Sequence, residues 1–483
     1  MVTSKFYIDG GWVEPISADV AEIISPASAR SIGRVSLGSA ADVERAVVAA
    51  DRAFASWSQT QPEERRAVLE RIVGIYARRG AEIADAMTAE MGAPVTLARG
   101  AQSGAGYGHL RDFVRAMDEI HWERPLFAGE DENRIVLEPK GVAALITPWN
   151  WPMNQIALKV GAALAAGCTM VLKPSELAPL SAALFAEVID EACVPAGVFN
   201  LVHGTGPVVG EALARDPRIS VISLTGSTRA GIAVTKLGAD TVKRVGLELG
   251  GKGANIIFAD ADPEKAAAET AQAMFRNSGQ SCNAPSRMLV ERPVYDRAVA
   301  AATEVARSLV VGDPTREATH LGPVISAAQF DRIQSLIQQG IAEGARLVTG
   351  GPGRPEGLAE GYYVKPTVFA DATNRMTIAR EEIFGPVLTI IPFDTEEEAV
   401  AIANDSVYGL AAYLWTSDRE RGRRLSRRLR SGMVRLNGTD LPYGSPFGGF
   451  GQSGIGREGG VWGIEEFLEV KAISGWPELE PAG

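Results

Sequence analysis

Residues 141–176, GVAALITPWNWPMNQIALKVGAALAAGCTMVLKPSE, contain the pattern that decides the fold. Two short apolar runs, 142–147 and 169–173, flank an apolar segment of helical length at 153–166. A strand, a helix and a second strand in this order form a βαβ unit, whose two strands are parallel. Because neither run alternates between apolar and polar residues, we expect a parallel sheet that is covered on both faces.

The same alternation continues on the C-terminal side of this unit. Apolar runs predict further strands at 198–202, 221–225 and 256–258, and helices are predicted at 178–192 and 228–237. The pattern predicts a doubly wound, Rossmann-like α/β sheet of the kind that binds nucleotides.

A second alternation follows Cys282. It consists of strand-like runs at 288–290 and 387–391 and of helical segments at 298–309 and 327–343. A second α/β domain is the natural interpretation of this pattern.

The segments outside these two alternations differ from one another. Ser39 and Asp42 form a capping-box start for an early helix, and Pro62 opens a second, long helix. The segment 119–139 and the tail after residue 465 are rich in charged and aromatic residues and have little helical period. We expect them to form extended arms that pair with another subunit or lie on the surface.

The composition excludes several classes of protein. A chain of 483 residues is too long for one core of ordinary size, so two or more packed units are expected. The net charge of -11 argues against a large nucleic-acid interface, and the basic cluster 419–430 is explained as the solvated face of a helix that buries Leu425 and Leu429. No apolar run reaches the roughly 18 to 20 residues that cross a bilayer. The N-terminus lacks the plan of a signal peptide, so we expect a cytoplasmic location.

The three cysteines and four histidines are too sparse and too far apart for a metal site or a disulfide framework. Cys168 and Cys193 lie among alanines in helical patterns and are predicted to be inert core thiols. Cys282 has small polar neighbours in NSGQSCNAP, which is typical of a reactive thiol but also of an unreactive loop thiol. The histidines show no local pairing with Cys282, which argues against a cysteine protease; only His203 ends a predicted strand.

Ligands of open α/β sheets bind at the carboxyl ends of the strands, where several polar residues stand here. Asn150 lies between two prolines and two tryptophans, so its amide is held rigidly enough to donate to a developing oxyanion, although a packing turn explains the motif equally well. Lys173 and Glu176 follow the next strand, where a carboxylate can accept the hydroxyls of a ribose. The carboxylate would also repel a 2′-phosphate, which favours NAD over NADP.

Two glycine-rich segments and one carboxylate complete the candidates. Gly226 and Ser227 open a helix where a pyrophosphate could approach backbone N–H groups, and Gly206 and Gly210 lie in a similar turn. Neither segment is the GxGxxG fingerprint, and simple turn chemistry explains each of them alone. Glu248 is surrounded by apolar residues and glycines in LELGGKG, which would raise its pKa toward that of a general base.

Seven motifs in this order resemble those of the aldehyde dehydrogenase superfamily: PWNWP, KPSE, TGSTRAG, LELGG, GQSC, EEIFGP and PFGGFGQSGIGRE. The resemblance extends from FYIDGGW near the N-terminus to FLEVKAI near the C-terminus. It implies oxidation of an aldehyde to a carboxylic acid with NAD, or with NADP as the alternative cofactor. Catalysis would proceed through a thioester on a cysteine.

The resemblance also implies roles for individual residues. Cys282 would be the nucleophile, Glu248 the base that activates the hydrolytic water, and Asn150 part of the oxyanion hole. The implied cofactor contacts are Trp149, Lys173, Glu176, Ser227, Glu382 and Phe384, to which the glycine-rich turns add Gly206, Gly210 and Gly226. The substrate pocket would include Trp151, Met153, Tyr107 and Phe447, where the large ring of Trp151 favours flat or slender aldehydes.

The family's architecture implies how the chain is divided. Residues 1–118 and 140–249 would bind NAD, 250–465 would form the catalytic domain, and 119–139 with 466–483 would form a small β arm that joins subunits. A homodimer or a tetramer of dimers is expected. Two other functions stay open. One is an acylating enzyme that passes the acyl group to coenzyme A, although Glu248 argues against it, and the other is a non-catalytic NAD-binding protein of the same fold.

Overall fold

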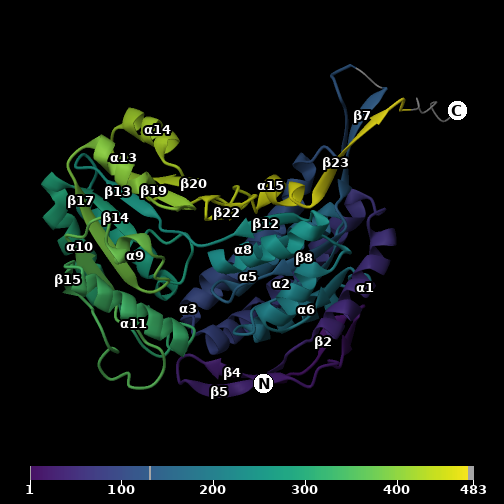
Figure 1. Ribbon diagram of the computed structural model, residues 1–483, viewed down its shortest axis with the longest axis horizontal. Coiled ribbons are helices and arrows are strands. Elements are labelled where there is room, and N and C mark those ends of the chain that lie inside the picture. The colour runs from purple at the N-terminus through teal and green to yellow at the C-terminus, as the bar shows by residue number, and fades with distance from the viewer. Residues whose placement is uncertain (1, 130–131, 477–483) are drawn as a thin grey trace.

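Two α/β lobes and a projecting β arm make up the chain in a computed structural model that describes residues 2–129 and 132–476 (Figure 1). Within these residues there are an eight-stranded sheet, a seven-stranded sheet and three smaller sheets. The prediction of a doubly wound α/β domain, a second α/β domain and a small β arm is confirmed.

The eight-stranded sheet, called the first sheet below, has a parallel centre. Its order is β22 (Gly454–Ile455), β12 (Arg244–Glu248), β11 (Ile219–Thr225), β8 (Val142–Ile146), β9 (Thr169–Lys173), β10 (Phe199–Leu201), β2 (Phe6–Ile8) and β3 (Gly11–Val13). Strands β12 to β10 are parallel, and the three strands at the edges pair antiparallel. The strands predicted at 142–147, 169–173, 198–202 and 221–225 all lie in this centre.

Helices cover both faces of the first sheet, as its continuous apolar strands require. One face packs against α1 (Ala40–Trp57), α7 (Glu211–Arg215) and α8 (Thr228–Gly238). The other face packs against α2 (Pro62–Met91), α4 (Ser103–Ala116), α5 (Pro152–Ala166) and α6 (Pro179–Glu191). The predicted capping box of Ser39 and Asp42 is present at the start of α1.

The seven-stranded sheet, called the second sheet, forms the other lobe. Its order is β15 (Arg346–Thr349), β16 (Thr367–Ala370), β17 (Val387–Phe393), β14 (Arg287–Glu291), β13 (Ala254–Ile257), β19 (Ala411–Trp415) and β20 (Met433–Leu436). Its two faces are covered by α9 (Pro263–Phe275) and α10 (Tyr295–Ser308), and by α11 (Ala327–Ala342), α12 (Thr377–Arg380), α13 (Glu396–Asn404) and α14 (Arg419–Arg428).

One predicted strand lies in a different sheet from the one expected. The pattern of apolar runs groups 256–258 with the nucleotide-binding sheet, whereas the family resemblance places these residues in the catalytic domain; β13 pairs with β14 and β19 of the second sheet. The place beside β11 is taken by β12, which ends at Glu248. This strand is hard to recognise because its sequence, RVGLE, contains a glycine and two charged residues.

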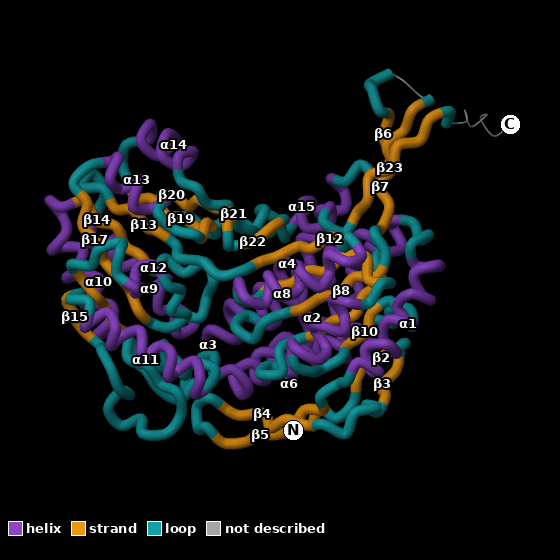
Figure 2. Tube along the Cα trace, in the orientation of Figure 1, coloured by secondary structure: helices purple, strands orange, loops and turns teal. Residues whose placement is uncertain are grey.

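The projecting arm is an antiparallel sheet of β6 (Glu123–Pro125), β7 (Asn133–Pro139) and β23 (Leu468–Ser474) (Figure 2). Of the predicted arm, residues 130–131 and 477–483 lie outside the described residues. Just before β23, the chain returns to the first lobe: β22 pairs with β12, and α15 (Gly460–Glu465) packs on α4 and α5. Residues 454–465 therefore contact the first lobe directly.

The remaining elements are short. They are β1 (Val2–Thr3), β4 (Val20–Ser25), β5 (Arg30–Ser36), β18 (Tyr408–Gly409), β21 (Phe450–Gly451), α3 (Val95–Leu97), and the π- or 3₁₀-helical segments η1 (Ala98–Gln102), η2 (Met117–Glu119), η3 (Gly206–Gly210), η4 (Ala239–Thr241), η5 (Arg276–Gly279) and η6 (Arg292–Val294).

Three smaller predictions are tested by this fold. Leu425 and Leu429 are buried beside α14, whose arginines pair with glutamates of α13, so the basic cluster is a solvated helix face as predicted. The prediction of two core thiols is right for Cys168, which is buried, and wrong for Cys193, which is exposed just after α6. Among the described residues, no helix is long and apolar enough to cross a membrane.

Candidate active site

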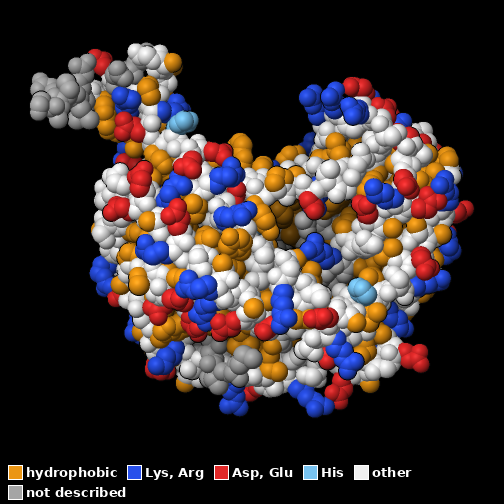
Figure 3. Space-filling view, turned by 180° about the vertical axis from the view of Figure 1, so that it is seen from behind, with side chains coloured by type: hydrophobic (Ala, Val, Ile, Leu, Met, Phe, Trp, Pro, Cys, Tyr) orange, Lys and Arg blue, Asp and Glu red, His pale blue; other side chains and the backbone are white. Residues whose placement is uncertain are grey.

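A cavity of about 250 Å³ opens between the two lobes and is lined by Cys282, Asn150 and several of the predicted cofactor contacts. The molecule is hollowed at this place in a space-filling view (Figure 3). The cavity is lined by Pro148, Trp149, Asn150, Thr225, Gly226, Ser227, Leu249 and Gly250 from the first lobe and its edge, and by Cys282, Gln329, Arg332, Glu382 and Phe384 from the second.

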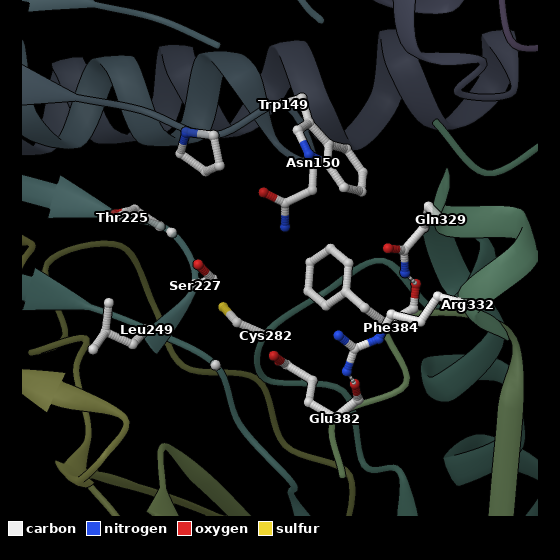
Figure 4. A pocket seen from close by; sticks show the side chains of 13 residues that line it. Trp149, Asn150, Thr225, Ser227, Leu249, Cys282, Gln329, Arg332, Glu382 and Phe384 are labelled. Atoms are coloured by element: carbon white, nitrogen blue, oxygen red, sulfur yellow. Dashed lines mark hydrogen bonds between the residues drawn. The ribbon is translucent and has the colours of Figure 1, made fainter. Parts of the chain in front are cut away.

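Cys282 lies in the loop after η5 and faces this cavity (Figure 4). The preceding Asn277, Ser278 and Gly279 all have positive φ angles, between 54° and 72°. Gly279 is required here, because a Cβ at this position would lie 2.1 Å from the carbonyl oxygen of Gly385. A run of left-handed residues costs free energy, so the surrounding contacts must hold this loop in place.

The surroundings of Cys282 keep its thiol protonated. Burial raises the pKa of this thiol above its ordinary value, and the carboxylates of Glu382 and Glu248 raise it further. The backbone N–H groups of Asn283 and Cys282 act in the opposite direction. A positive charge in the cavity would therefore be needed to make the thiolate abundant near neutral pH.

Asn150 is 4% exposed, and its side chain points into the cavity toward Cys282 (Figure 4). Its Nδ2 atom donates to the carbonyl oxygen of Gln280 at 3.0 Å. An amide nitrogen carries two hydrogens, so one is used in this bond and the other is available to a ligand. The structure thus brings the amide and the thiol together from the two lobes.

Glu248 is also near, but its carboxylate does not line the cavity of Cys282. The side chain lies in a smaller cavity between β11, β12 and the 455–467 segment, with Ser223, Arg457 and Glu458. Neither carboxylate oxygen has a hydrogen-bond partner among the described residues. Burial and the charge of Glu458 raise the pKa of Glu248 well above its ordinary value, while the charges of Lys159 and Arg457 oppose the shift.

Lys159 and Glu458 form a buried ion pair next to Glu248. Lys159 is 1% exposed, and its ammonium contacts the carboxylate of Glu458 and donates to Ser223 Oγ at 3.0 Å. No role was predicted for either residue from the sequence, because Lys159 lies inside an apolar helix, and Glu458, which ends the motif PFGGFGQSGIGRE, is more than 200 residues from Glu248. The signal for Lys159 in the sequence is that it is a charged residue in an otherwise apolar helix.

Another wall of the Cys282 cavity is formed by Glu382, Phe384 and Trp149. Glu382 Oε1 accepts a hydrogen bond from the Gly251 N–H at 2.9 Å, and burial raises the pKa of Glu382 to about 7. Phe384 has a φ of 57°, and its ring meets the ring of Trp149 edge-on at 5.5 Å.

Two residues of α11 support this wall and were not predicted from the sequence. Gln329 Nε2 donates to the carbonyl oxygens of Ile383 and Phe384, and Arg332 donates to the carbonyl oxygen of Glu382. Their exposed, polar helix face gave no signal that distinguishes it from an ordinary solvated surface. They hold the strained segment around Phe384 in its observed conformation.

The residues predicted to bind a dinucleotide continue from this cavity along the first sheet. Ser227 is the N-cap of α8 and accepts from the Ala230 N–H, so the positive end of the helix faces Gly226 and the cavity. Lys173 ends β9, is 4% exposed and pairs with Glu176 at 3.4 Å. Burial lowers the pKa of Lys173. Carboxylate, ammonium and helix N-terminus at the carboxyl ends of parallel strands suit the riboses and pyrophosphate of NAD.

Gly206 and Gly210 lie beyond β10, at the same end of the sheet. They begin and end the π-helical turn η3 instead of forming a loop. A Cβ at Gly206 would meet nothing within 4 Å, so the backbone there is open to a ligand. Neither glycine lines the cavity of Cys282.

The predicted substrate residues are distributed unevenly. Trp151 donates from Nε1 to Ser281 Oγ at 2.8 Å, next to Cys282, and Phe447 packs in the same small cluster as Cys282. Tyr107 lies partly buried in α4. Met153 exposes no surface and packs in the core of the first lobe, so its side chain is a structural one here.

Comparison with known proteins agrees with this geometry. Residues 12–473 match the model of the aldehyde dehydrogenase family. The chain is 52% identical over 473 residues to a 3-succinoylsemialdehyde-pyridine dehydrogenase of a Pseudomonas species, with 98% of each chain covered.

Solved structures are equally similar. An aldehyde dehydrogenase from Bartonella henselae superposes with a TM-score of 0.97 at 52% identity, covering 99% of this chain and 100% of that chain. A cysteine-to-alanine mutant of aldehyde dehydrogenase C from Pseudomonas syringae, complexed with NAD+ and octanal, gives 0.96 at 50% identity, covering 99% and 98%. From its sequence, its fold and its site, this chain belongs to the aldehyde dehydrogenase family.

Proposed function

We propose that this protein oxidises an aldehyde to a carboxylic acid with NAD through a thioester on Cys282. As a member of the aldehyde dehydrogenase family, it is an oxidoreductase that acts on aldehydes. The observation that carries the detailed proposal is that Cys282 and Asn150, from different lobes, line one cavity together with Glu382, Phe384 and Ser227.

NAD would be held by Lys173, Glu176 and the N-terminus of α8 at one end, and by Glu382 and Phe384 at the other. When bound, it supplies the acceptor for the two electrons and the hydrogen that leave the substrate carbon. The carboxylate of Glu176 beside Lys173 favours NAD, because it would repel the 2′-phosphate of NADP. The relatives complexed with NAD+ support this choice.

The first step for the protein is formation of the Cys282 thiolate, which attacks the carbonyl carbon. Because burial and two carboxylates raise the pKa of this thiol, the reactive form depends on compensating charge in the cavity. The free hydrogen of Asn150 Nδ2 would then bind the oxygen that becomes negatively charged. A preorganised donor of this kind is typically worth about 10²- to 10³-fold in rate.

Hydrolysis of the thioester requires a base, for which Glu248 is the candidate. Its raised pKa suits a base that works near neutral pH. Its side chain must turn from the smaller cavity toward Cys282. The absence of a side chain at Gly448 makes room for the position that Glu248 occupies in this structure, because a Cβ there would lie 2.6 Å from Glu248 Oε1.

The aldehyde would enter on the side of Trp151, Tyr107 and Phe447, whose rings favour an aromatic or slender apolar tail. The pyridine-bearing substrate in the name of one relative and the octanal bound to another support this class. We also propose that the protein is a cytoplasmic homodimer or tetramer whose subunits meet along the arm of β6, β7 and β23.

The test is the absorbance at 340 nm during incubation with NAD or NADP and a panel of aliphatic, pyridyl and charged aldehydes, beside Cys282→Ala. Cofactor reduction that Cys282→Ala abolishes is the expected result. Transfer of the acyl group to added coenzyme A in place of water would instead favour an acylating enzyme. If the protein binds NAD but turns over no aldehyde, and Cys282 resists alkylation, the result would favour a non-catalytic NAD-binding protein.

A further inference from the structure

Behind Asn150 and Cys282 lies a group of buried amide side chains that the reaction itself does not use. Its members are Gln102, Asn277 and Gln280, which are 0%, 2% and 1% exposed. Gln102 comes from η1 in the first lobe, whereas Asn277 and Gln280 belong to the loop that carries Cys282. Buried amides are normally held by hydrogen bonds, and these three bond to one another or to nearby backbone groups, although Gln102 Oε1 has no partner among the described residues.

The hydrogen bonds fix the direction of each amide. Asn277 Nδ2 donates to the carbonyl oxygens of Asn150 at 2.9 Å and Gln280 at 3.2 Å. The Oδ1 atom of Asn277 must therefore point the other way, where Gln102 Nε2 donates to it at 3.0 Å. A second hydrogen of Gln102 Nε2 reaches the carbonyl oxygen of Asn150 at 3.4 Å.

The π-helical turn η1 explains how Gln102 reaches this place. The N–H of Ser103 bonds to the carbonyl oxygen of Ala98, five residues earlier, so the turn holds one residue more than an α-helical turn. One extra residue rotates the next positions by about 100° around the helix axis. Such turns are rare and often occur at functional sites, which is what this placement of Gln102 indicates.

We propose that Gln102 is a positioning residue, which fixes the Asn150 amide and the Cys282 loop in register across the two lobes. Without a donor at position 102, Asn277 Oδ1 is left unsatisfied or the amide turns over and places Oδ1 against two carbonyl oxygens. Either change displaces the Gln280 carbonyl, which is the atom that holds Asn150 Nδ2. The inference rests on the proposed roles of Asn150 and Cys282.

The test compares Gln102→Leu with Tyr76→Phe. Tyr76 is a matched control, because its buried hydroxyl donates to the neighbouring Ser103 carbonyl oxygen at 3.0 Å but touches none of the amides. We expect Gln102→Leu to lower kcat about 10- to 100-fold, since small displacements of reacting groups cost this much, with the KM for NAD within about twofold. Tyr76→Phe should change only the melting temperature. A Gln102→Leu kcat within threefold of wild type, or an equal loss in Tyr76→Phe, overturns the proposal.

A second variant keeps the test decisive if Gln102→Leu does not fold. The carboxyl of Gln102→Glu can donate to Asn277 Oδ1 when protonated, whereas its carboxylate cannot. The activity of this variant relative to wild type should therefore fall as the pH rises. A ratio that stays flat from pH 6 to about 10 contradicts a donating role.

The double variant Gln102→Leu with Asn150→Ala separates the two proposals. If Gln102 acts through Asn150, the double variant should lose clearly less than the product of the two single losses. If the loss in the double variant equals the product of the two single losses, the inference about Gln102 is overturned, but the oxyanion role of Asn150 is not. Wild-type activity in Asn150→Ala would instead overturn the oxyanion role, and with it the inference.

Discussion

Lys159 is one of two positive charges that act on Glu248, the other being Arg457, so replacing it by methionine tests how Glu248 works. Its ammonium pairs with Glu458, and its charge lowers the pKa of Glu248 while the charge of Glu458 raises it. In Lys159→Met, only Arg457 is left to oppose the effect of Glu458 on Glu248. The buried methionine keeps the volume and the apolar stem of the lysine, so the main change is electrostatic.

The expected shift follows from the usual effect of a neighbouring charge. Loss of an opposite charge at close range raises the pKa of a carboxylic acid by about 1 to 3 units. Each unit corresponds to about 1.4 kcal/mol, so the ionised fraction of Glu248 falls roughly 10- to 1,000-fold at any pH below its pKa. The rate of thioester hydrolysis, which needs the ionised base, should fall by the same factor.

The assay is the pH dependence of kcat together with the pre-steady-state burst of NADH. In Lys159→Met we expect the acidic limb of kcat to move to higher pH by about 1 to 3 units while the burst persists, because acylation does not use Glu248. The double variant Lys159→Met with Glu458→Gln removes the opposing charge as well, so its limb should return toward the wild-type position. A folded Lys159→Met enzyme with an unmoved limb, or a double variant that shifts as far as the single one, would refute this account of Glu248.

Three further predictions concern other residues. Iodoacetamide should label Cys193 and Cys282 but not buried Cys168 in the native protein, and it should label Cys282 faster when NAD is present. Mass spectrometry of labelled Cys193→Ser and wild type checks this, and rapid labelling of Cys168 would contradict it. Glu176→Gln should raise kcat/KM for NADP relative to NAD by at least about tenfold, since one repulsive charge beside the ribose is removed; an unchanged ratio would refute the role of Glu176. Buried Glu90 has a pKa raised to about 7, so the stability present below its unfolded pKa of 4.5 is lost as the pH rises through about 7. The free energy of unfolding of wild type should therefore drop by about 2 to 3 kcal/mol more than that of Glu90→Gln between pH 5 and pH 8, which urea unfolding at the two pH values measures; equal drops would count against this.

Local sequence patterns were sufficient for most central elements of the first sheet, because its helices carry a helical period and its strands, apart from β12, are short apolar runs. Runs such as 169–173 are continuously apolar and lie in the centre of a sheet, where both faces are buried. The pairing of strands is not a local property, which is why the sequence pattern did not show that β12, and not β13, lies beside β11. A short strand such as RVGLE is stabilised by β11 and by the returning β22, neither of which is adjacent to it in the sequence.

The same distinction applies to the site. Asn150, Cys282 and Glu248 could be predicted, because each stands in a short motif whose composition differs from its surroundings. Gln102, Lys159 and Gln329 could not, because their roles come from partners 55 to 299 residues away. Cys193 shows the reverse error: its alanine-rich context suggested a core position, but it follows the last turn of α6 and has a positive φ of 52°.

Interactions that align the proposed catalytic groups also join the two lobes. Asn150 reaches Gln280, Trp151 reaches Ser281, and Gln102 reaches Asn277, each from the first lobe to the loop of Cys282. The left-handed residues before Cys282 store strain that these contacts must offset. A change that opens the lobes therefore also releases the loop and separates the amide from the thiol. Loss of activity on mild denaturation should accordingly precede loss of helical structure, since interfaces between domains generally open at a lower free energy than hydrophobic cores unfold.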